Sequence, residues 1–216
     1  MWASENHRHK DGVVKIESNI KEVIKGLSTL ESKQVPFAIM NTLNDLAFAA
    51  KKALEKETED KVDKPTPFTK KAVRVTKANK RKLETFVFIN EAQAEYMQYL
   101  YNGGVEKPKN KALPKPTQNL KLNQYGNITR TKVKTLLNNK KKYFSGQPKG
   151  HPGASSGIWE RYGSKKNQRI RVLITWAKEK EKKKVMDFGE IVRISTSKNQ
   201  ATLFRKALDH ALKTAK

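Results

Sequence analysis

The sequence predicts an α+β fold, in which a small antiparallel sheet from two hairpins packs with N-terminal and C-terminal helices. Three observations predict it. Apolar residues recur at helical spacing at both ends of the chain, two pairs of short alternating segments lie between them, and a turn joins each pair. Strands that pair with their sequence neighbours favour this class over a doubly wound sheet. A long basic loop, at about residues 105–157, is inserted between the hairpins.

The N-terminal part predicts two helices after a flexible tail at residues 1–12. Apolar spacing indicates the first helix from about Val13 to Ser32. Pro36 suits the first turn of a second helix, so we expect a break before it, although one continuous helix with a kink at Pro36 is the alternative. The second helix has an apolar face for core or oligomer packing: Phe37, Met40, Leu43, Ala47, Ala50 and Leu54.

Local signals define the remaining elements. Thr66 is expected to cap a short turn at Pro67, and Asp187 is expected to cap a helix that contains Phe188. The other predicted elements are strands at Val73–Val75 and Leu83–Ile89, a helix at Glu91–Tyr101 that stops at Gly103-Gly104, a helix from Thr129 to Leu137, an irregular stretch at Ser145–Gly157, strands at Ile158–Tyr162 and Arg169–Trp176, and a last helix from Thr196 or Ser197. The predicted domain organisation is a single domain over residues 13–216 with an extended basic arm at about 105–157.

The composition is strongly basic. The 216 residues include 46 Lys and Arg against 21 Asp and Glu, a formal charge of +25. Such a charge weakens the compact state unless an anionic partner offsets it. Nucleic acid, an acidic protein surface and an anionic membrane are the natural partners, but no run of about 18 apolar residues predicts a membrane span, and we expect no membrane partner.

Positive charge concentrates in two acid-free stretches, Lys64–Lys82 and Lys107–Trp159. Lysine predominates there, which favours non-specific attraction to phosphates over base reading. Contact with genomic DNA and contact with acidic neighbouring subunits remain equally open. The predicted contact residues are Lys70, Lys71, Arg74, Lys77, Lys80, Arg81, Lys82, Lys107, Lys109, Lys111, Lys115, Lys140, Lys141 and Lys142.

Enzyme signatures are weak. The chain has no cysteine, no Gly-rich phosphate loop and no dinucleotide fingerprint. His151 near Ser155 and Ser156 lacks a neighbouring acid, and the acidic residues lie mostly in Lys-rich helical runs rather than in a cluster that could hold a cation. We therefore expect no enzyme, no cofactor and no metal site, with a metal-dependent nuclease as a minor alternative.

Four features of the sequence occur together: the N-terminal helix followed by Val35–Asn44, the basic hairpin of Phe68–Val75 and Leu83–Ile89, the segment Tyr96–Gly104, and Gly157–Arg161. In this combination they resemble the phage minor tail protein Z family, also described as tail-completion proteins. The resemblance covers about residues 13–215, and the insert at Lys107–Gly157 does not align.

This resemblance implies a non-enzymatic virion component at the head–tail junction or upper tail, with no catalytic residues. It also implies a homo-oligomeric ring around the DNA path, in contact with other tail, connector or portal-associated proteins. The expected location is the virion tail or neck, after assembly in the host cytoplasm. A free, non-specific DNA-binding protein is the main alternative, and its affinity should fall steeply with salt.

Overall fold

The computed structural model describes residues 12–17, 29–109 and 112–214. The expected flexible tail at residues 1–12 lies outside the described residues, except for Gly12. The chain separates into two compact units where we expected one domain. The first unit combines residues 1–103 with 183–216, and the inserted unit is residues 104–182. Each unit is described by itself below.

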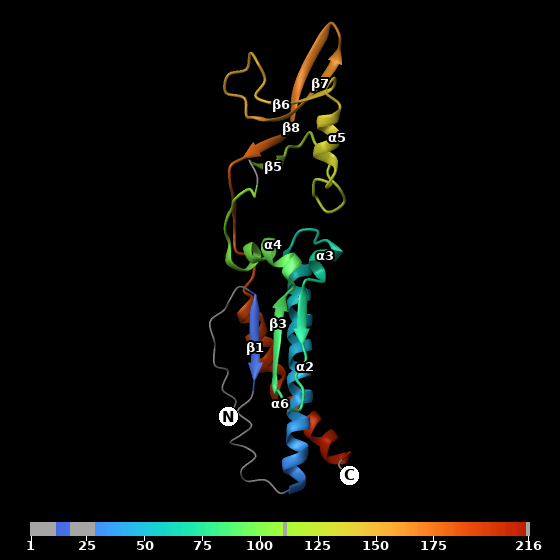
Figure 1. The fold of residues 1–216 in the computed structure, drawn as a ribbon, viewed down its shortest axis with the longest axis vertical. Coiled ribbons are helices and arrows are strands. Elements are labelled where there is room, and N and C mark those ends of the chain that lie inside the picture. The colour runs from blue at the N-terminus through green and yellow to red at the C-terminus, as the bar shows by residue number, and fades with distance from the viewer. Residues whose placement is uncertain (1–11, 18–28, 110–111, 215–216) are drawn as a thin grey trace. The chain divides into compact units, whose positions relative to one another are not determined.

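The first unit contains a three-stranded antiparallel sheet with helices packed against it (Figure 1). Its strand order is β1-β3-β2, so β3 is the central strand. Its elements are β1 (Val13–Glu17), α2 (Thr29–Lys61), α3 (Pro67–Lys70), β2 (Val73–Thr76), β3 (Glu84–Ile89), α4 (Glu91–Asn102) and α6 (Phe188–Lys213). The predicted first hairpin, the helix after it and the stop at Gly103, where φ is 67°, are confirmed.

The prediction of a helix from Val13 to Ser32 is wrong at its start. Residues 13–17 form strand β1, which pairs with β3 and places Val14 opposite Val87 and Ile16 opposite Thr85. Exposure alternates along β1 with the two-residue period of a strand, so Val14 and Ile16 face the core. Pairing along the edge of β3 outweighs the helical spacing. The apolar residues Ile20, Val23, Ile24 and Leu27, on which the helix prediction also rested, lie outside the described residues.

Helix α2 continues through Pro36, so the preferred break is wrong, and the continuous alternative holds from Thr29 onward. Proline lacks an N–H and removes one hydrogen bond of the helix ladder. Tertiary packing maintains the helix across this gap, because Val35, Ile39 and Leu43 on either side of the proline belong to one buried cluster. The predicted apolar face is confirmed at Leu43, Ala47, Ala50 and Leu54, which are all at most 1% exposed.

Helix α6 is likewise continuous from Phe188 to Lys213, so the separate last helix predicted from Thr196 or Ser197 is wrong. The side chain of Asp187 accepts a 2.9 Å hydrogen bond from the N–H of Glu190 and caps the helix, as predicted. The hydroxyls of Thr196 and Ser197 instead donate to carbonyls one turn earlier, at Val192 and Arg193, and cap nothing.

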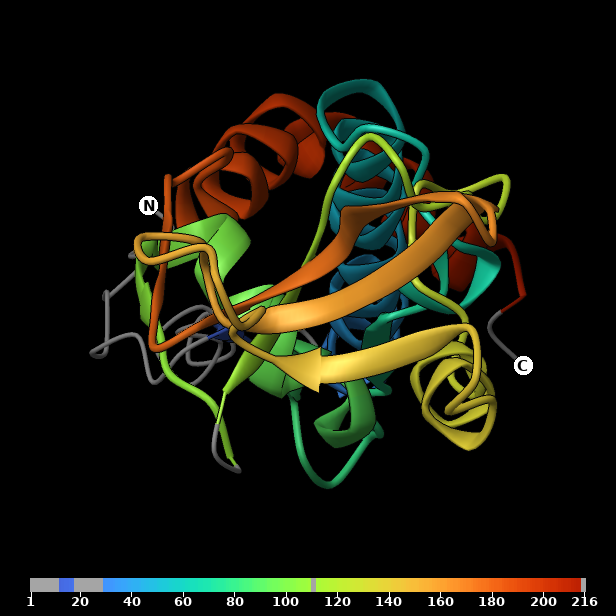
Figure 2. The same cartoon turned by 90° about the horizontal axis from the view of Figure 1, so that it is seen from above.

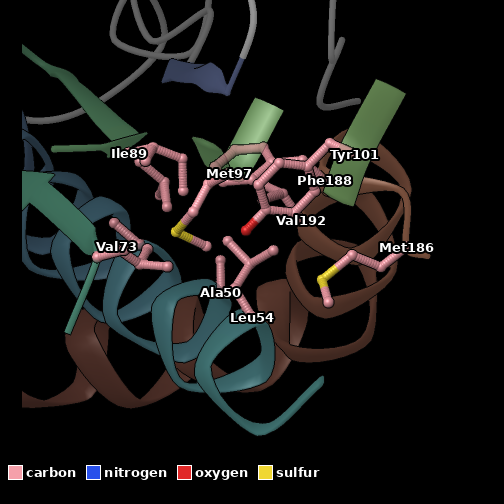
Figure 3. Close-up of a cluster of buried hydrophobic side chains, with 12 residues drawn as sticks. Ala50, Leu54, Val73, Ile89, Met97, Tyr101, Met186, Phe188 and Val192 are labelled. Atoms are coloured by element: carbon pink, nitrogen blue, oxygen red, sulfur yellow. The ribbon is translucent and has the colours of Figure 1, made fainter. Parts of the chain in front are cut away.

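The core of the first unit joins elements from both ends of the chain (Figure 3). Its largest cluster is Ala47, Ala50, Leu54, Ala72, Val73, Val87, Ile89, Met97, Tyr101, Met186, Phe188 and Val192. The rings of Tyr101 and Phe188 meet edge to face at 5.2 Å. Burial raises the pKa of Tyr101 to about 12. A second contact between α2 and α6 consists of small residues, Ala38 with Ala207 and Ala211, which let the two helix backbones approach closely.

The inserted unit is built around a four-stranded antiparallel sheet of order β5-β8-β7-β6 (Figure 2). Its elements are β4 (Gly104–Glu106), β5 (Leu113–Pro116), α5 (Lys132–Asn138), β6 (Tyr143–Gly146), β7 (Gly157–Ser164), β8 (Asn167–Ala177) and β9 (Lys180–Lys182). The predicted second hairpin is confirmed as β7 and β8, and each strand is longer than expected. β4 and β9 pair with each other in a two-stranded sheet.

The basic stretch at 105–157 is a folded part of this unit and not the extended arm that we expected. It supplies β5, α5 and β6, and its Leu120 and Leu136 are buried with Ile158, Leu173 and Ile174. Its Pro, Gly and Lys content led us to expect little apolar burial. Leu120 and Leu136 lie 16 residues apart and far from their core partners in the sequence, so no local pattern indicates that they share a core. Within the predicted irregular stretch Ser145–Gly157, residues 145–146 belong to β6 and Gly157 opens β7.

In the part of the chain that the structure describes, none of the helices has the length and apolar character needed to cross a membrane.

Candidate nucleic-acid interface

The predicted cations of the first unit are spread along α2 and do not form one patch. Lys70 pairs with Glu59 at 3.0 Å near the end of the helix, and the ammonium of Lys80 lies 5.1 Å from the ring centre of Phe37 near its start. Glu59 and Phe37 are about 33 Å apart along the helix axis, at a rise of about 1.5 Å per residue. Lys77 lies between them, 5.6 Å from the ring of Phe48.

Acidic residues neutralise part of this charge. Lys82 pairs with Glu84 at 2.5 Å, and Lys15 reaches the same carboxylate at 2.8 Å. Hydrogen bonds from Lys15 and Lys82 lower the pKa of Glu84. Among the described residues, no ion pair involves Lys71, Arg74 or Arg81, which are all exposed. The predicted contact cations of the first unit are therefore scattered, and acidic residues neutralise part of them.

The inserted unit carries most of the net charge. Residues 104–182 include 20 Lys and Arg but only 4 Asp and Glu, so they hold +16 of the total +25. Two of the four acids are engaged inside the unit: Glu106 pairs with Lys182 at 3.1 Å, and Glu160 is bound by two cations. The balance of acidic and basic residues thus differs sharply between the two units, and most of the excess positive charge lies in the inserted unit.

Glu160, on β7, is a buried carboxylate that pairs with two cations of the inserted unit. Its side chain is only 8% exposed, accepts a 2.6 Å hydrogen bond from Nε of Arg171, and pairs with Nζ of Lys142 at 3.1 Å. Burial raises the pKa of this carboxyl, but the hydrogen bonds from Arg171 and Lys142 outweigh it and leave the pKa below its usual value. The ionised carboxylate therefore holds β8 and the turn before β6 against β7.

Arg161, also on β7, braces the turn that carries the three consecutive lysines. Its Nη1 donates hydrogen bonds to the carbonyls of Lys140 and Lys141, at 3.1 and 3.4 Å. Its guanidinium lies 4.5 Å from the ring centre of Phe144, which stacks on Trp159. The backbone of the turn is therefore fixed, and the exposed side chains of Lys140 and Lys141 make no ion pair among the described residues.

The comparisons with known proteins were negative. No family model, curated protein or solved structure matches this chain. The interpretation of its surfaces therefore depends on their own geometry.

The end of the β7–β8 hairpin, residues 161–170, is a second basic feature of the inserted unit. β6 pairs with β7 only at residues 157–160, and β5 pairs with β8 only at residues 174–177. The hairpin end is consequently a two-stranded ribbon that extends beyond β5 and β6 (Figure 1). Residues 162–169 are all exposed, and residues 161–178 contain no acid.

The other predicted contact residues do not gather. Lys107 and Lys109 are exposed in the segment that directly follows β4. Lys115 is exposed on the edge strand β5, opposite Thr175. Lys111 lies outside the described residues. Of the predicted set, the structure brings together only Lys140, Lys141 and Lys142 in the inserted unit.

Sequence reasoning missed the residues that organise these cations, namely Arg161 and Glu160, and left Lys165 and Lys166 out of the contact set. Lys165 and Lys166 could have been found from the turn that they occupy within an acid-free stretch. Arg161 had no such signal, because its role depends on register with β6. The described residues hold no group of three or more His, Cys, Asp or Glu that could bind a metal ion.

Proposed function

We propose that this chain is a structural component of a tailed-phage virion at the head–tail junction or upper tail. In this role it forms a ring around the DNA path and joins neighbouring tail or connector proteins. The observation that carries the proposal is that the two units differ in character. The first unit packs a large apolar core, whereas the inserted unit holds +16 of the +25 charge. A chain with one strongly cationic unit and one unit with a large apolar core suits a protein that contacts both DNA and neighbouring proteins.

The resemblance of several segments to minor tail protein Z supports the virion role. The basic hairpin of that resemblance corresponds to β2 and β3, and the segment Tyr96–Gly104 corresponds to the end of α4. The partly buried Phe86 and Phe88 lie on the face of β3 opposite the buried Val87 and Ile89. In a ring, such a face offers apolar area to an adjacent subunit.

The test is the composition of purified particles. Mass spectrometry of tailed particles from the host that carries the gene should detect this chain at a few to a dozen copies, and gold labelling of an affinity tag should mark the neck or upper tail. The purified chain should form a closed oligomer by light scattering, alone or with its neck partners. Absence from the particles, together with a strictly monomeric chain, would overturn the proposal.

A free DNA-binding protein is the second candidate, and the charge of the inserted unit favours it equally. The two candidates differ in where the chain is found. A free protein should coat DNA in the cell, remain absent from particles, and bind duplexes of any sequence with an affinity that falls steeply as salt rises. Particle composition therefore separates them.

A further inference from the structure

We propose that the end of the β7–β8 hairpin, residues 161–170, is a ribbon that enters the major groove of double-stranded DNA. The inference rests on the proposed function, because it specifies which part of the inserted unit meets the DNA. Four observations carry it: the free projection of the ribbon, its dimensions, the placement of its cations, and its lack of acids.

The projection is defined by strand register. Tyr162 pairs with Arg169, Gly163 with Gln168 and Ser164 with Asn167, and in the described structure these residues have no other strand beside them. Arg161, which pairs with Ile170 at the base of the ribbon, still donates its N–H to the carbonyl of Lys142 beside β6. The ribbon continues the two central strands of the four-stranded sheet, which support it at its base. Residues 162–169 are all exposed, so both faces of the ribbon are open to a partner.

The dimensions match the major groove of B-DNA. Two paired strands are about 4.8 Å apart, and three residue steps from the Arg161–Ile170 pair to the tip extend about 10 Å. The major groove is about 12 Å wide and 8.5 Å deep, and admits a two-stranded ribbon. The reach of the tip is therefore sufficient to enter the groove while the rest of the unit stays outside the phosphate backbone.

The cations are placed to contact the two phosphate chains that border the groove. Lys165 and Lys166 occupy the tip, and Arg169 lies on β8 opposite Tyr162. The guanidinium of Arg171 lies 5.1 Å from the ring centre of Tyr162 and is held by Glu160, so this face of the ribbon is fixed. Among the described residues, Lys165, Lys166 and Arg169 form no ion pair and remain available.

A double-stranded partner fits better than an unpaired strand. Single strands are held mainly by aromatic side chains on which bases stack, and Tyr162 is the only aromatic residue of the ribbon. Double-stranded RNA fits poorly, because its major groove is deep and narrow. The ribbon should therefore distinguish a DNA duplex from an RNA duplex of the same sequence.

The experiment measures binding of the full chain to a fluorescent 25-base-pair DNA duplex as salt is varied. The triple variant Lys165→Ala, Lys166→Ala and Arg169→Ala should bind at least about tenfold more weakly, and the slope of log affinity against log salt should fall by about 2 to 3. The control triple variant Lys71→Ala, Arg74→Ala and Arg81→Ala removes the same charge from the first unit, and its slope should fall by less than about 1.

A charge-neutral variant separates shape from charge. Gly163 has a φ of +96°, and an added Cβ would lie 2.4 Å from the carbonyl oxygen of Asn167. Gly163→Ala should therefore distort the tip, weaken DNA binding several-fold, and leave RNA-duplex binding unchanged. The unmodified chain should prefer DNA over RNA by about tenfold, and both the triple variant and Gly163→Ala should show a clearly smaller preference.

Equal losses from the two triple variants, equal affinity for DNA and RNA duplexes, or no affinity for DNA would each overturn the ribbon proposal. The last result would leave an acidic protein as the partner of the inserted unit. Virion composition tests the proposed function separately. A chain that is present in particles but fails the DNA experiment would refute the ribbon inference alone.

Discussion

Nε of Arg171 donates a 2.6 Å hydrogen bond to Oε2 of Glu160, and this contact crosses from β8 to β7 at a carboxylate that is only 8% exposed. Glu160→Gln should destabilise the inserted unit by about 1 to 3 kcal/mol, because it removes the charge that Arg171 and Lys142 share. Two of the three tryptophans, Trp159 and Trp176, lie in this unit. Urea unfolding followed by tryptophan fluorescence in a Trp2→Phe background therefore measures the effect.

Glu106→Gln is the matched control for that substitution, because Glu106 lies in the same unit as the reporting tryptophans. Glu106 pairs with Lys182 at 3.1 Å, but both side chains are about one third exposed, so solvent screens the pair. Its loss should change the unfolding midpoint far less than Glu160→Gln does. An equal effect of the two substitutions would show that burial of Glu160 does not strengthen its contacts.

The same carboxylate predicts an acid-sensitive stability. Because the pKa of Glu160 is lowered in the folded state, its contribution is fully present above the usual pKa of about 4.5 and is lost as the pH falls through the lowered value. The stability difference between the unmodified chain and Glu160→Gln should therefore be constant from pH 7 to pH 5 and should shrink in stronger acid. A difference that grows on acidification would contradict the assignment. Urea midpoints measured at one-unit pH intervals provide the check.

Gly157→Ala should unfold or strongly destabilise the inserted unit. An added Cβ at Gly157 would lie 2.1 Å from the carbonyl oxygen of Ile174, which is backbone in the middle of the sheet and cannot move aside. Thermal unfolding followed by tryptophan fluorescence should show a fall in Tm of more than about 5 °C. The exposed neighbour Ser156, changed to alanine, should leave Tm within about 1 °C and serves as the control.

Asp187→Ala should destabilise the first unit by about 1 kcal/mol, because the side chain of Asp187 accepts the N–H of Glu190 and caps α6. Asn90 occupies the same position before α4 but makes no side-chain cap hydrogen bond. Asn90→Ala should therefore cost less. Helical circular dichroism during guanidinium unfolding reports both variants, and a larger loss for Asn90→Ala would contradict the capping assignment.

Leu54→Ala should cost about 2 to 5 kcal/mol in the first unit, since Leu54 is fully buried between α2, α4 and α6. Leu212→Ala removes the same atoms at a site that is 43% exposed, and should cost well under 1 kcal/mol. Denaturant unfolding monitored by helical circular dichroism compares the two. Similar costs would mean that the core around Leu54 is loosely packed.

Local signals predicted the elements whose ends are determined by nearby residues. Thr66 and Asp187 cap helices, and Gly103 ends α4, because each acts on backbone groups within a few residues. The errors at β1, Pro36 and Thr196 have a different origin. In each case tertiary packing decided the outcome: β3 pairs with residues 13–17, one buried cluster spans Pro36, and Val192 and Ser195 are buried beside Thr196.

The candidate site was predictable in charge but not in arrangement. The acid-free stretch Lys107–Trp159 includes Lys140, Lys141 and Lys142, whose contact with a partner stays a prediction, and Arg161 braces their turn only because β6 and β7 pair in one register. The hairpin signal at residues 158–176 was clear, but the free projection of its end depends on how far β5 and β6 extend. Sequence alone does not give those pairing limits.

The pairing of β4 with β9 also bears on the order of events during synthesis. Gly104 lies opposite Lys182, so the inserted unit begins and ends at one place and can complete its sheet as soon as residue 182 leaves the ribosome. The apolar face of α2, by contrast, receives its α6 partner only when the last residues are made. Domains generally fold as units during translation. The inserted unit should therefore be finished while α2 still awaits its partner, so the apolar face of α2 stays uncovered for longer than the core of the inserted unit.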